Sequence, residues 1–325
     1  MKIPNMAVIG SFWLTEEMIK AVNGRDDIRY YSQYSRDLSR AIEFGKNKGA
    51  VKFYDDLEDL AGCQDIDIVY IASPNAFHYE QTKKLLMSGK HVLCEKPATL
   101  HADQFRELCA IADNKGVIYM EAMMNIHQDS ASKLKEVITK GGDVISARID
   151  FNQRSSKLDR WKAGENFSTF SKETGGGALN DLGVYITSLV TFLFGKPADV
   201  FAKASYNESG ADMKDTAVLI YDGFEVICTM SKLAESIIRS EILCENVSVR
   251  FDNVSRLENI EKHTSEEIKR ISEKKSFVEC MNYELDDFLS YMKGSREGYM
   301  KCRALTEMSL ELLERIRNAT SSQTI

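Results

Sequence analysis

"AVIGSFWLTEEMIKAV", residues 7–22, decides the fold, because it joins an apolar run to a helical pattern across a glycine. The run ends at Gly10, and a spacing typical of a helix begins near Thr15. A strand, a turn and a helix in this order open dinucleotide-binding folds, where the turn meets a pyrophosphate. Phe12 stands where the usual G-x-G-x-x-G pattern has its second glycine. The stretch therefore predicts the fold and leaves nucleotide binding open.

Short apolar runs alternate with amphipathic patterns over the first third of the chain. The expected strands are residues 6–10, 28–34, 51–54, 66–72, 91–94 and 117–121, and the expected helices are residues 15–22, 37–46, 56–61, 77–88 and 102–114. Alternation with short loops predicts a parallel sheet covered on both faces. "DIDIVYIAS" is almost continuously apolar after Asp67, as a strand buried on both faces requires.

The pattern changes near residue 123, where strands begin to follow one another. Expected strands are the alternating stretch "VISARIDFNQRS" and residues 200–206, 216–221, 225–231, 240–244 and 247–252, and expected helices are residues 130–140, 178–194, 277–292 and 301–318. Consecutive strands favour an antiparallel or mixed sheet. A chain of 325 residues fits two domains of roughly 100 to 200 residues. We expect domains at 1–122 and 123–325, with helix 301–318 at their junction.

Composition excludes several classes of partner. Hydrophobic residues make up 43% and charged residues 28% of the chain, and the net charge of −7 argues against nucleic acid or an anionic membrane. Seven scattered cysteines without a C-x-x-C favour reduced thiols over a disulfide framework or a zinc site. No signal peptide or membrane span is expected. The composition predicts a cytoplasmic protein without a bound metal.

The second predicted strand ends in "YSRD", where NAD-binding folds place an acid for the ribose hydroxyls. Ser35 and Arg36 occupy that position instead. A hydroxyl and a guanidinium suit a 2′-phosphate, because Arg offers several donors and a permanent charge. The pair therefore favours NADP over NAD. Alternatively, Arg36 is a solvated residue at a helix start.

The next polar cluster lies in "YIASPNAFHYE". Ligands of open α/β sheets bind beyond the carboxyl ends of the strands, which is where Ser73, Pro74 and Asn75 are expected. His78 either serves this crevice or is a capping or core histidine.

The fifth apolar strand runs into "GKHVLCEKPATL". Pro97 ends this strand because it has no amide hydrogen to donate. Glu95 and Lys96 then leave the sheet together, and a lysine there points into the crevice. Taken alone, a Glu-Lys pair is more often a surface feature.

"GGGALNDLGVYITSL" supplies the last cluster. Asp181 and Tyr185 are four residues apart and share a face of the expected helix. Three glycines before that helix allow the chain to approach another backbone or a ligand closely. The alternative is a flexible loop and an ordinary hydrogen-bonded pair.

Together these motifs resemble one family in order and spacing. The segments are "YSRDLSRAIEFGKNKG", "YDDLEDL", "DIDIVYIASPNAFHYE", "GKHVLCEKP", "VIYMEAMM" and "GGGALNDLGVY". They resemble the Gfo/Idh/MocA family of NAD(P)-dependent oxidoreductases, nearly continuously over residues 6–195. Within the family the chain looks closest to the branch of dimeric dihydrodiol dehydrogenases, because "DLGxY" replaces the D-x-G-x-H ending of many sugar and inositol dehydrogenases.

The resemblance implies an α/β protein with an N-terminal Rossmann domain. A C-terminal α/β domain would carry a large, mostly antiparallel open sheet that bears the substrate site and often forms a dimer. It also implies three catalytic roles. Lys96 would be the proton donor or hydrogen-bond donor to the substrate oxygen, Tyr185 the second acid/base, and Asp181 the carboxylate that orients the substrate or the lysine. The implied cofactor-binding residues are Gly10, Ser11, Phe12, Trp13, Ser35, Arg36, Ser73, Pro74, Asn75, His78 and Glu95.

The expected activity is hydride transfer between NADP, or else NAD, and a secondary alcohol or carbonyl. The substrate is expected to be a small sugar, polyol or dihydrodiol-like compound, and the protein a homodimer or dimer-based oligomer. Substrate contacts are expected from Arg148, Asp150, Asn152, Trp161 and Lys162. Phe12 motivates an alternative, a non-catalytic nucleotide or ligand sensor, and a reductase with another substrate, as in biliverdin-reductase-like relatives, is a third possibility.

Overall fold

The computed structural model describes residues 2–321 and divides the chain into two compact units. The first comprises Met1–Ala122 and Ser276–Arg303, and the second comprises Met123–Lys275 and Ala304–Ile325. The chain thus changes unit after residue 122, where the sequence predicts a boundary, and changes again twice. Residues 276–303 were expected in the second domain, whereas their contacts group them with the first unit.

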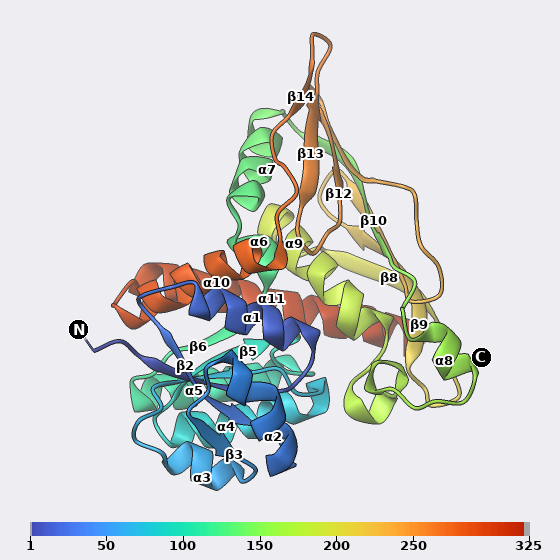
Figure 1. The fold of residues 1–325 in the computed structure, drawn as a ribbon. Coiled ribbons are helices and arrows are strands. Elements are labelled where there is room, and N and C mark those ends of the chain that lie inside the picture. The colour runs from blue at the N-terminus through green and yellow to red at the C-terminus, as the bar shows by residue number, and fades with distance from the viewer. Residues whose placement is uncertain (1, 322–325) are drawn as a thin grey trace. The chain divides into compact units, whose positions relative to one another are not determined.

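The first unit contains a six-stranded sheet in the order β3-β2-β1-β4-β5-β6. Its strands are β1 Asn5–Ile9, β2 Arg29–Tyr34, β3 Lys52–Tyr54, β4 Ile68–Ile71, β5 His91–Glu95 and β6 Tyr119–Ala122. Figure 1 labels β2, β3, β5 and β6 among them. All neighbouring strands are parallel, as predicted. The order reverses between β1 and β4, which places the ligand crevice of such sheets at the carboxyl ends of these two strands.

Six complete α-helices and residues 296–303 of α11 Arg296–Ser321 accompany this sheet in the described part of the first unit. The complete helices are α1 Trp13–Asn23, α2 Leu38–Gly45, α3 Leu57–Gly62, α4 His78–Met87, α5 Ala102–Lys115 and α10 Phe277–Met292. Asp37 caps α2 by accepting hydrogen bonds from two amides, and Ser276 and Glu279 form a capping box on α10. α10 packs against α1, and the ring of Phe277 meets the ring of Trp13 edge to face at 4.9 Å. This contact brings the late segment 276–303 back to the first turn of α1.

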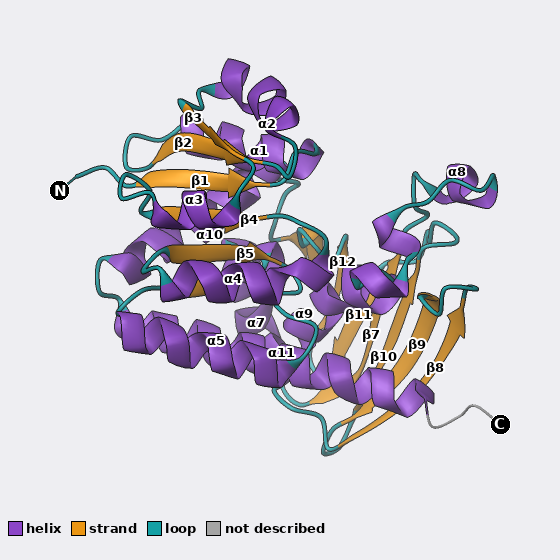
Figure 2. Ribbon diagram, turned by 90° about the horizontal axis from the view of Figure 1, so that it is seen from below, coloured by secondary structure: helices purple, strands orange, loops and turns teal. Residues whose placement is uncertain are grey.

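The second unit contains an eight-stranded sheet in the order β14-β13-β12-β11-β7-β10-β9-β8, most of which Figure 2 shows side by side. Its strands are β7 Val144–Asn152, β8 Asp199–Tyr206, β9 Asp212–Ile220, β10 Glu225–Ser231, β11 Ser240–Cys244, β12 Ser248–Asp252, β13 Glu258–His263 and β14 Ile268–Arg270. Only β7 and β10 pair in parallel among these described strands. The mostly antiparallel open sheet is therefore confirmed.

One face of this sheet is buried by helices. They are α7 Asp129–Lys140, α9 Val184–Phe194 and residues 304–321 of α11 Arg296–Ser321. Leu134, Leu189 and Leu313 join the inward side chains of the strands in one apolar core. Alternate strand residues face the other way, and Phe201 on β8 and Ile227 on β10 are 56% and 40% exposed. The shorter helices are α6 Met124–His127 and α8 Leu158–Lys162.

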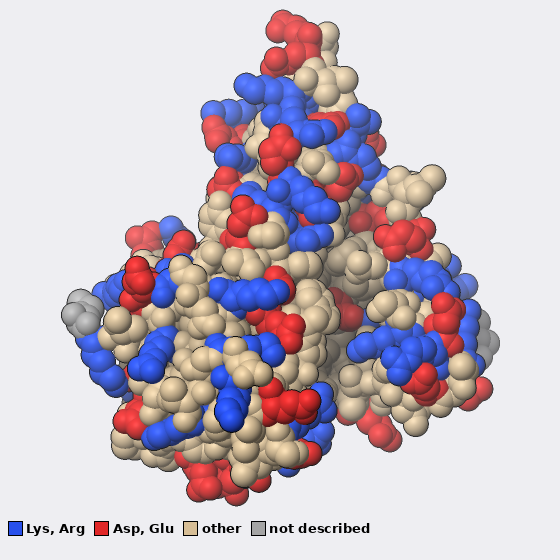
Figure 3. All heavy atoms as spheres, in the orientation of Figure 1, with Lys and Arg blue, Asp and Glu red and all other residues tan. Residues whose placement is uncertain are grey.

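One segment among the described residues, Lys172–Phe194, is long and apolar enough to cross a membrane. No such segment was expected from the sequence. Its most apolar window is 78% buried inside the structure, as the core helix of a folded domain is. On the face drawn in Figure 3, basic and acidic side chains are intermixed, without a continuous field of one sign.

Candidate active site

The turn after β1 requires one glycine. Gly10 has φ of +119°, and a Cβ there would lie 2.6 Å from the carbonyl oxygen of Ala72. Gln33 fixes the same turn, because its Nε2 donates to the Gly10 carbonyl at 2.5 Å. α1 begins directly after the turn, with Phe12 as an N-cap residue whose side chain makes no capping hydrogen bond. Amides at such a helix start are donors for an anion.

Phe12 and the acids that follow it are accommodated at this helix start. The Phe12 backbone is extended, with φ of −144° and ψ of 177°, and the side chain is 41% exposed. Glu16 pairs with Lys48 at 3.2 Å, and Glu17 pairs with Lys20 at 2.6 Å. Two cations thus offset the negative charge that these glutamates bring to the first turns.

Two arginines lie at the carboxyl end of β2. Arg36 is exposed, and its guanidinium carbon lies 5.6 Å from the centre of the Phe77 ring. Ser35 precedes it, and the Ser35 amide donates to Tyr54 at 3.1 Å. The second arginine, Arg40, donates to the Ser11 carbonyl at 3.4 Å. Sequence reasoning missed Arg40, which lies in the first turn of α2, after the N-cap residue Asp37.

His78 links the two loops that follow β4 and β5. It is fully buried, with Nδ1 2.8 Å from the Pro97 carbonyl and Nε2 2.9 Å from the Ser73 carbonyl. Burial lowers the pKa of His78. Ser73 also donates to Gln81 at 2.7 Å. Pro74 and Asn75 begin a short 3-10 turn, η2 Asn75–Phe77, in the same loop.

The Glu-Lys-Pro turn begins where β5 ends, as the sequence predicts. Glu95 is buried and accepts a hydrogen bond from the Tyr70 hydroxyl at 2.6 Å and one from the Lys96 amide at 3.3 Å. The Lys96 side chain is only partly buried. Glu121 on β6 accepts from the Ala98 amide at 2.8 Å, which fixes the far side of the turn.

A third carboxyl, Glu284 on α10, is buried in the same unit. Its pKa is raised well above the ordinary value by burial and by the charges of Glu95 and Glu121. Burial and these two charges both favour the protonated form of Glu284. The sequence offered no signal for Glu284, since a glutamate inside an amphipathic helix is usually solvated.

The three consecutive glycines at residues 175–177 allow a close approach to another stretch of the chain, as the sequence predicts. A Cβ at Gly176 would overlap the backbone of Ser168, and one at Gly177, where φ is +122°, would overlap the Asp212 carboxylate. The Gly177 amide donates to the Thr169 carbonyl at 3.1 Å. The glycine turn therefore packs on the 3-10 turn η3 Ser168–Phe170.

Asp181 lies in a π-helical turn, η5 Leu179–Gly183, that runs directly into α9. Such turns occur frequently at functional sites. Asp181 forms an ion pair with Lys232, and the Lys232 ammonium also donates to the Thr169 hydroxyl at 2.7 Å. Lys232 is 3% exposed. Sequence reasoning predicted the helix and missed both its π-helical start and Lys232.

Tyr185 is the second residue of α9 and is 8% exposed. Its ring packs edge to face on Phe151 of β7, with centroids 5.8 Å apart. The Tyr185 carbonyl accepts from the Asn125 side chain at 2.9 Å. The phenol is thus carried by a helix that is fixed from two neighbouring elements.

Family models match both units of the chain. The model for an oxidoreductase family with an NAD-binding Rossmann fold, GFO_IDH_MocA, matches residues 4–123, and the GFO/IDH/MocA C-terminal domain matches residues 132–250. The scyllo-inositol 2-dehydrogenase (NADP(+)) IolU of Bacillus subtilis (strain 168) is 33% identical over 291 residues, which are 89% of this chain and 88% of IolU. The chain belongs to the Gfo/Idh/MocA family of oxidoreductases.

Other relatives agree with this membership. A trans-1,2-dihydrobenzene-1,2-diol dehydrogenase of Xenopus tropicalis is 31% identical over 214 residues, or 65% of this chain and 62% of that protein. The solved structure of KijD10, a 3-ketoreductase from Actinomadura kijaniata in complex with NADP and TDP-benzene, has a TM-score of 0.84, 20% identity and 98% coverage of both chains. This Gfo/Idh/MocA chain is an NAD(P)-dependent oxidoreductase, as the sequence motifs indicated.

Three of the expected substrate contacts do not join Asp181 and Tyr185. On β7, the inward-facing residues include Phe151, whose ring packs on Tyr185. The positions between the inward-facing residues are occupied by Arg148, Asp150 and Asn152. Alternate residues of a strand face opposite sides, so these three belong to the outer face. There Asp150 accepts hydrogen bonds from Asn152 at 2.5 Å and from Thr229 at 2.6 Å.

The other two expected contacts lie on α8. Trp161 packs against the Phe170 ring at 5.2 Å, and Phe170 directly follows Thr169. Lys162 is exposed at the end of the same helix. Of the five residues, Trp161 is the one that the structure connects to the surroundings of Asp181.

Proposed function

We propose that this Gfo/Idh/MocA protein interconverts a secondary alcohol and a carbonyl on a small cyclic polyol, sugar or dihydrodiol, with NADP preferred over NAD. The observation that carries the proposal is Lys96, a partly buried lysine at the carboxyl end of β5 in a sheet whose order makes that edge the ligand crevice. The substrate class follows the names of the relatives, which act on inositol and on dihydrobenzenediol.

The residues of the first unit fit NADP. The uncapped start of α1, at Ser11, Phe12 and Trp13, offers backbone amides to a pyrophosphate. The exposed guanidinium of Arg36 beside the Phe77 ring suits a 2′-phosphate next to an aromatic base, because charge-assisted and stacking contacts are available together. His78 serves this site by holding the Ser73 loop to the Pro97 loop.

Lys96 manages the proton of the reacting oxygen. The bound nicotinamide supplies the hydride chemistry. During oxidation the Lys96 Nζ takes the proton that the substrate hydroxyl loses, and during reduction it returns that proton. The Tyr185 hydroxyl is the second acid/base, and the Asp181 carboxylate orients the substrate through hydrogen bonds.

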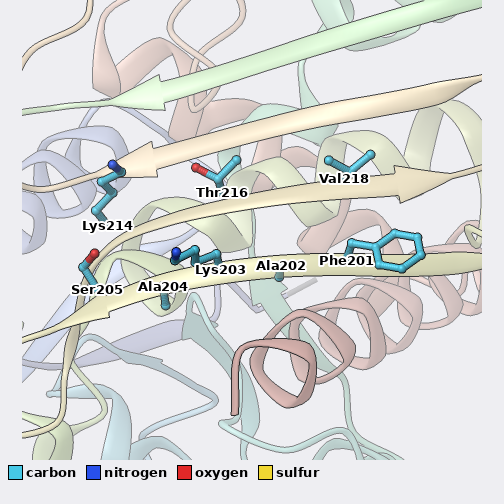
Figure 4. Close-up of a pocket in the computed structure, with 8 residues that line it drawn as sticks. All are labelled: Phe201, Ala202, Lys203, Ala204, Ser205, Lys214, Thr216 and Val218. Atoms are coloured by element: carbon cyan, nitrogen blue, oxygen red, sulfur yellow. The ribbon is translucent and has the colours of Figure 1, made fainter. Parts of the chain in front are cut away.

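The finer assignments concern assembly and location. Phe201 and Ile227 are exposed on the open sheet, and a shallow pocket on β8 and β9 is lined by Phe201, Lys203, Ser205, Lys214, Thr216 and Val218 (Figure 4). Apolar side chains on an exposed sheet face favour a second copy as partner. Light scattering on wild type and Phe201→Lys tests the homodimer, which the added charge would dissociate.

The proposed location is the cytoplasm. The seven cysteines are all free, in keeping with a reducing compartment.

Cofactor binding is tested first by fluorescence titration with NADPH and NADH. We expect saturable binding of both, tighter for NADPH, and a loss of that preference in Arg36→Ala by roughly tenfold or more, because a charge-assisted hydrogen bond contributes about 1.5 to 3 kcal/mol. Arg250→Ala, an exposed arginine on β12, is the matched control. If neither nucleotide binds saturably, the non-catalytic sensor becomes the better description.

Catalysis is tested with a substrate panel of scyllo-inositol and trans-1,2-dihydrobenzene-1,2-diol. Lys96→Met should lower kcat by at least about a hundredfold, since positioned proton transfer contributes roughly 10² to 10⁴. The NADPH affinity of the variant should stay within about twofold of wild type. Unchanged turnover in Lys96→Met would remove the assignment.

A further inference from the structure

Lys232 is a buried lysine that the proposed reaction does not yet use. It directly follows β10, and its backbone amide donates to the Met213 carbonyl at 3.0 Å. Its side chain is only 4% exposed. Lysines are almost never fully buried unless they are paired. The groups that the Lys232 ammonium contacts therefore indicate the role of this side chain.

Both hydrogen-bonding partners of the Lys232 ammonium lie in the second unit and come from separate segments. One is the carboxylate of Asp181 in η5, and the other is the Thr169 hydroxyl in η3 at 2.7 Å. Thr169 also donates to Asp181, at 3.4 Å. The three groups form a closed triangle of hydrogen bonds. Packing of Gly176 against Ser168 brings two of its corners together.

The exposures within this triangle are unequal. The Asp181 side chain is 40% exposed, whereas that of Lys232 is 4% exposed. A ligand can reach the carboxylate while the ammonium stays behind it. Lys232 is therefore suited to act on Asp181 rather than on a substrate.

We propose that Lys232 is a positioning residue for the oxidoreductase reaction, which holds the Asp181 carboxylate ionised and in one orientation. This inference rests on the proposed function of Asp181. A buried ammonium favours the charged form of a neighbouring carboxyl, and two fixed donors restrict its rotation. An orienting carboxylate needs both properties, because a protonated or rotating carboxyl presents the wrong atoms to a substrate hydroxyl.

The test is a double-mutant cycle on the full chain. Wild type, Lys232→Met, Asp181→Asn and the double variant are assayed with NADP and the panel substrate that wild type oxidises fastest. We expect Lys232→Met to lower kcat at least tenfold while the affinity for NADPH stays within twofold. If Lys232 acts through Asp181, the double variant is no slower than Asp181→Asn within a factor of two. Losses that multiply would overturn the positioning role.

Further variants separate positioning from simple structural damage. Lys232→Arg keeps the positive charge and should recover at least a third of the lost kcat, whereas Thr169→Val should lower kcat about threefold to tenfold. Lys140→Met, which removes a lysine that is 74% exposed, is the matched control and should leave kcat unchanged. If Lys232→Met does not fold, the double variant, which removes both charges of the ion pair, and Thr169→Val carry the test.

The two hypotheses fail in different ways. A wild type that oxidises no member of the panel contradicts the proposed function, and the role of Lys232 fails with it. An active wild type with an equally active Lys232→Met overturns only the role of Lys232.

Discussion

Each unit of the molecule leads a glycine turn into a helix, and the two turns differ in what meets the first amides of that helix. After Gly10, the N-cap of α1 offers no capping side chain. After Gly177, the Asp212 carboxylate accepts a hydrogen bond from the Leu179 amide at 2.6 Å. The first helix start is left for an anion, and the second is closed by the chain's own carboxylate. A glycine turn before a helix is therefore not by itself a nucleotide site, since the capping group decides its use.

The same comparison explains the missing second glycine. Gly10 is required because a Cβ there would meet the Ala72 carbonyl oxygen. Phe12 adopts an extended backbone that any residue can adopt. The turn thus keeps the one glycine whose geometry demands it and tolerates a side chain two residues later.

The largest effects on the two glycine turns are expected from Gly10→Ala and Gly176→Ala. Each added methyl group overlaps backbone atoms, so we expect the free energy of unfolding to fall by about 3 kcal/mol in either variant. Gly10→Ala should lose about 1 kcal/mol more, because φ is positive at Gly10. Urea unfolding measures this loss. Gly62→Ala, with nothing within 4 Å of its Cβ, is the control and should change stability by under about 1 kcal/mol.

The two glycine variants should also separate in function. Gly10→Ala should weaken NADPH binding, while Gly176→Ala should keep that affinity and lose turnover, because it moves Thr169 and Asp181. Equal losses of NADPH affinity in both variants would contradict the division of roles.

The second turn, at Asp212, should make the free energy of unfolding depend on pH through the neighbouring Asp215. Burial and the nearby Asp212 charge raise the pKa of Asp215 to about 9. The folded state therefore keeps a proton on Asp215 that the unfolded chain releases above about pH 4. The protonated carboxyl makes its full contribution to the free energy of unfolding below pH 4. This contribution is lost as the pH rises toward 9, by up to about 1.4 kcal/mol per pH unit. Asp215→Asn should flatten the fall in unfolding free energy between pH 6 and 9. Exposed Asp222→Asn should keep the wild-type slope, and identical slopes for all three proteins would refute the shift.

The cap itself is tested by Asp212→Ala. Loss of the hydrogen bond to Leu179 should destabilise the protein by about 1 kcal/mol and lower kcat, because this helix carries Asp181. Asp56→Ala removes the comparable cap of α3, where Glu58 donates at 2.6 Å. It should cause a similar loss of stability at full turnover. A normal kcat in Asp212→Ala would show that the cap does not position Asp181.

The smallest effect is expected from Phe12→Gly. Its extended backbone and 41% exposure predict a change in the NADPH Kd of less than about threefold, or about 0.7 kcal/mol. Fluorescence titration measures it. Tightening of more than tenfold would mean that the ring occupies the phosphate position.

The strands of both sheets were predictable where apolar residues set a clear period, as in "DIDIVYIAS". β13 and β14 were missed because their charged residues, such as Glu261 and Lys262, hide any alternation. Motifs that resemble a family made Lys96, Asp181 and Tyr185 candidates for the site, and their roles stay predictions. The sequence could not indicate Lys232, Arg40 or Glu284, because the groups that surround each of them lie far away in the sequence.

The return of α10 to the first unit has a consequence for protein engineering. Exchange of the second unit between Gfo/Idh/MocA relatives requires three crossover points, after residues 122, 275 and 303. The last one falls inside α11, so a chimera must keep that helix in register through the junction. A fragment that stops at residue 122 would lack Phe277 and leave Trp13 without its aromatic neighbour.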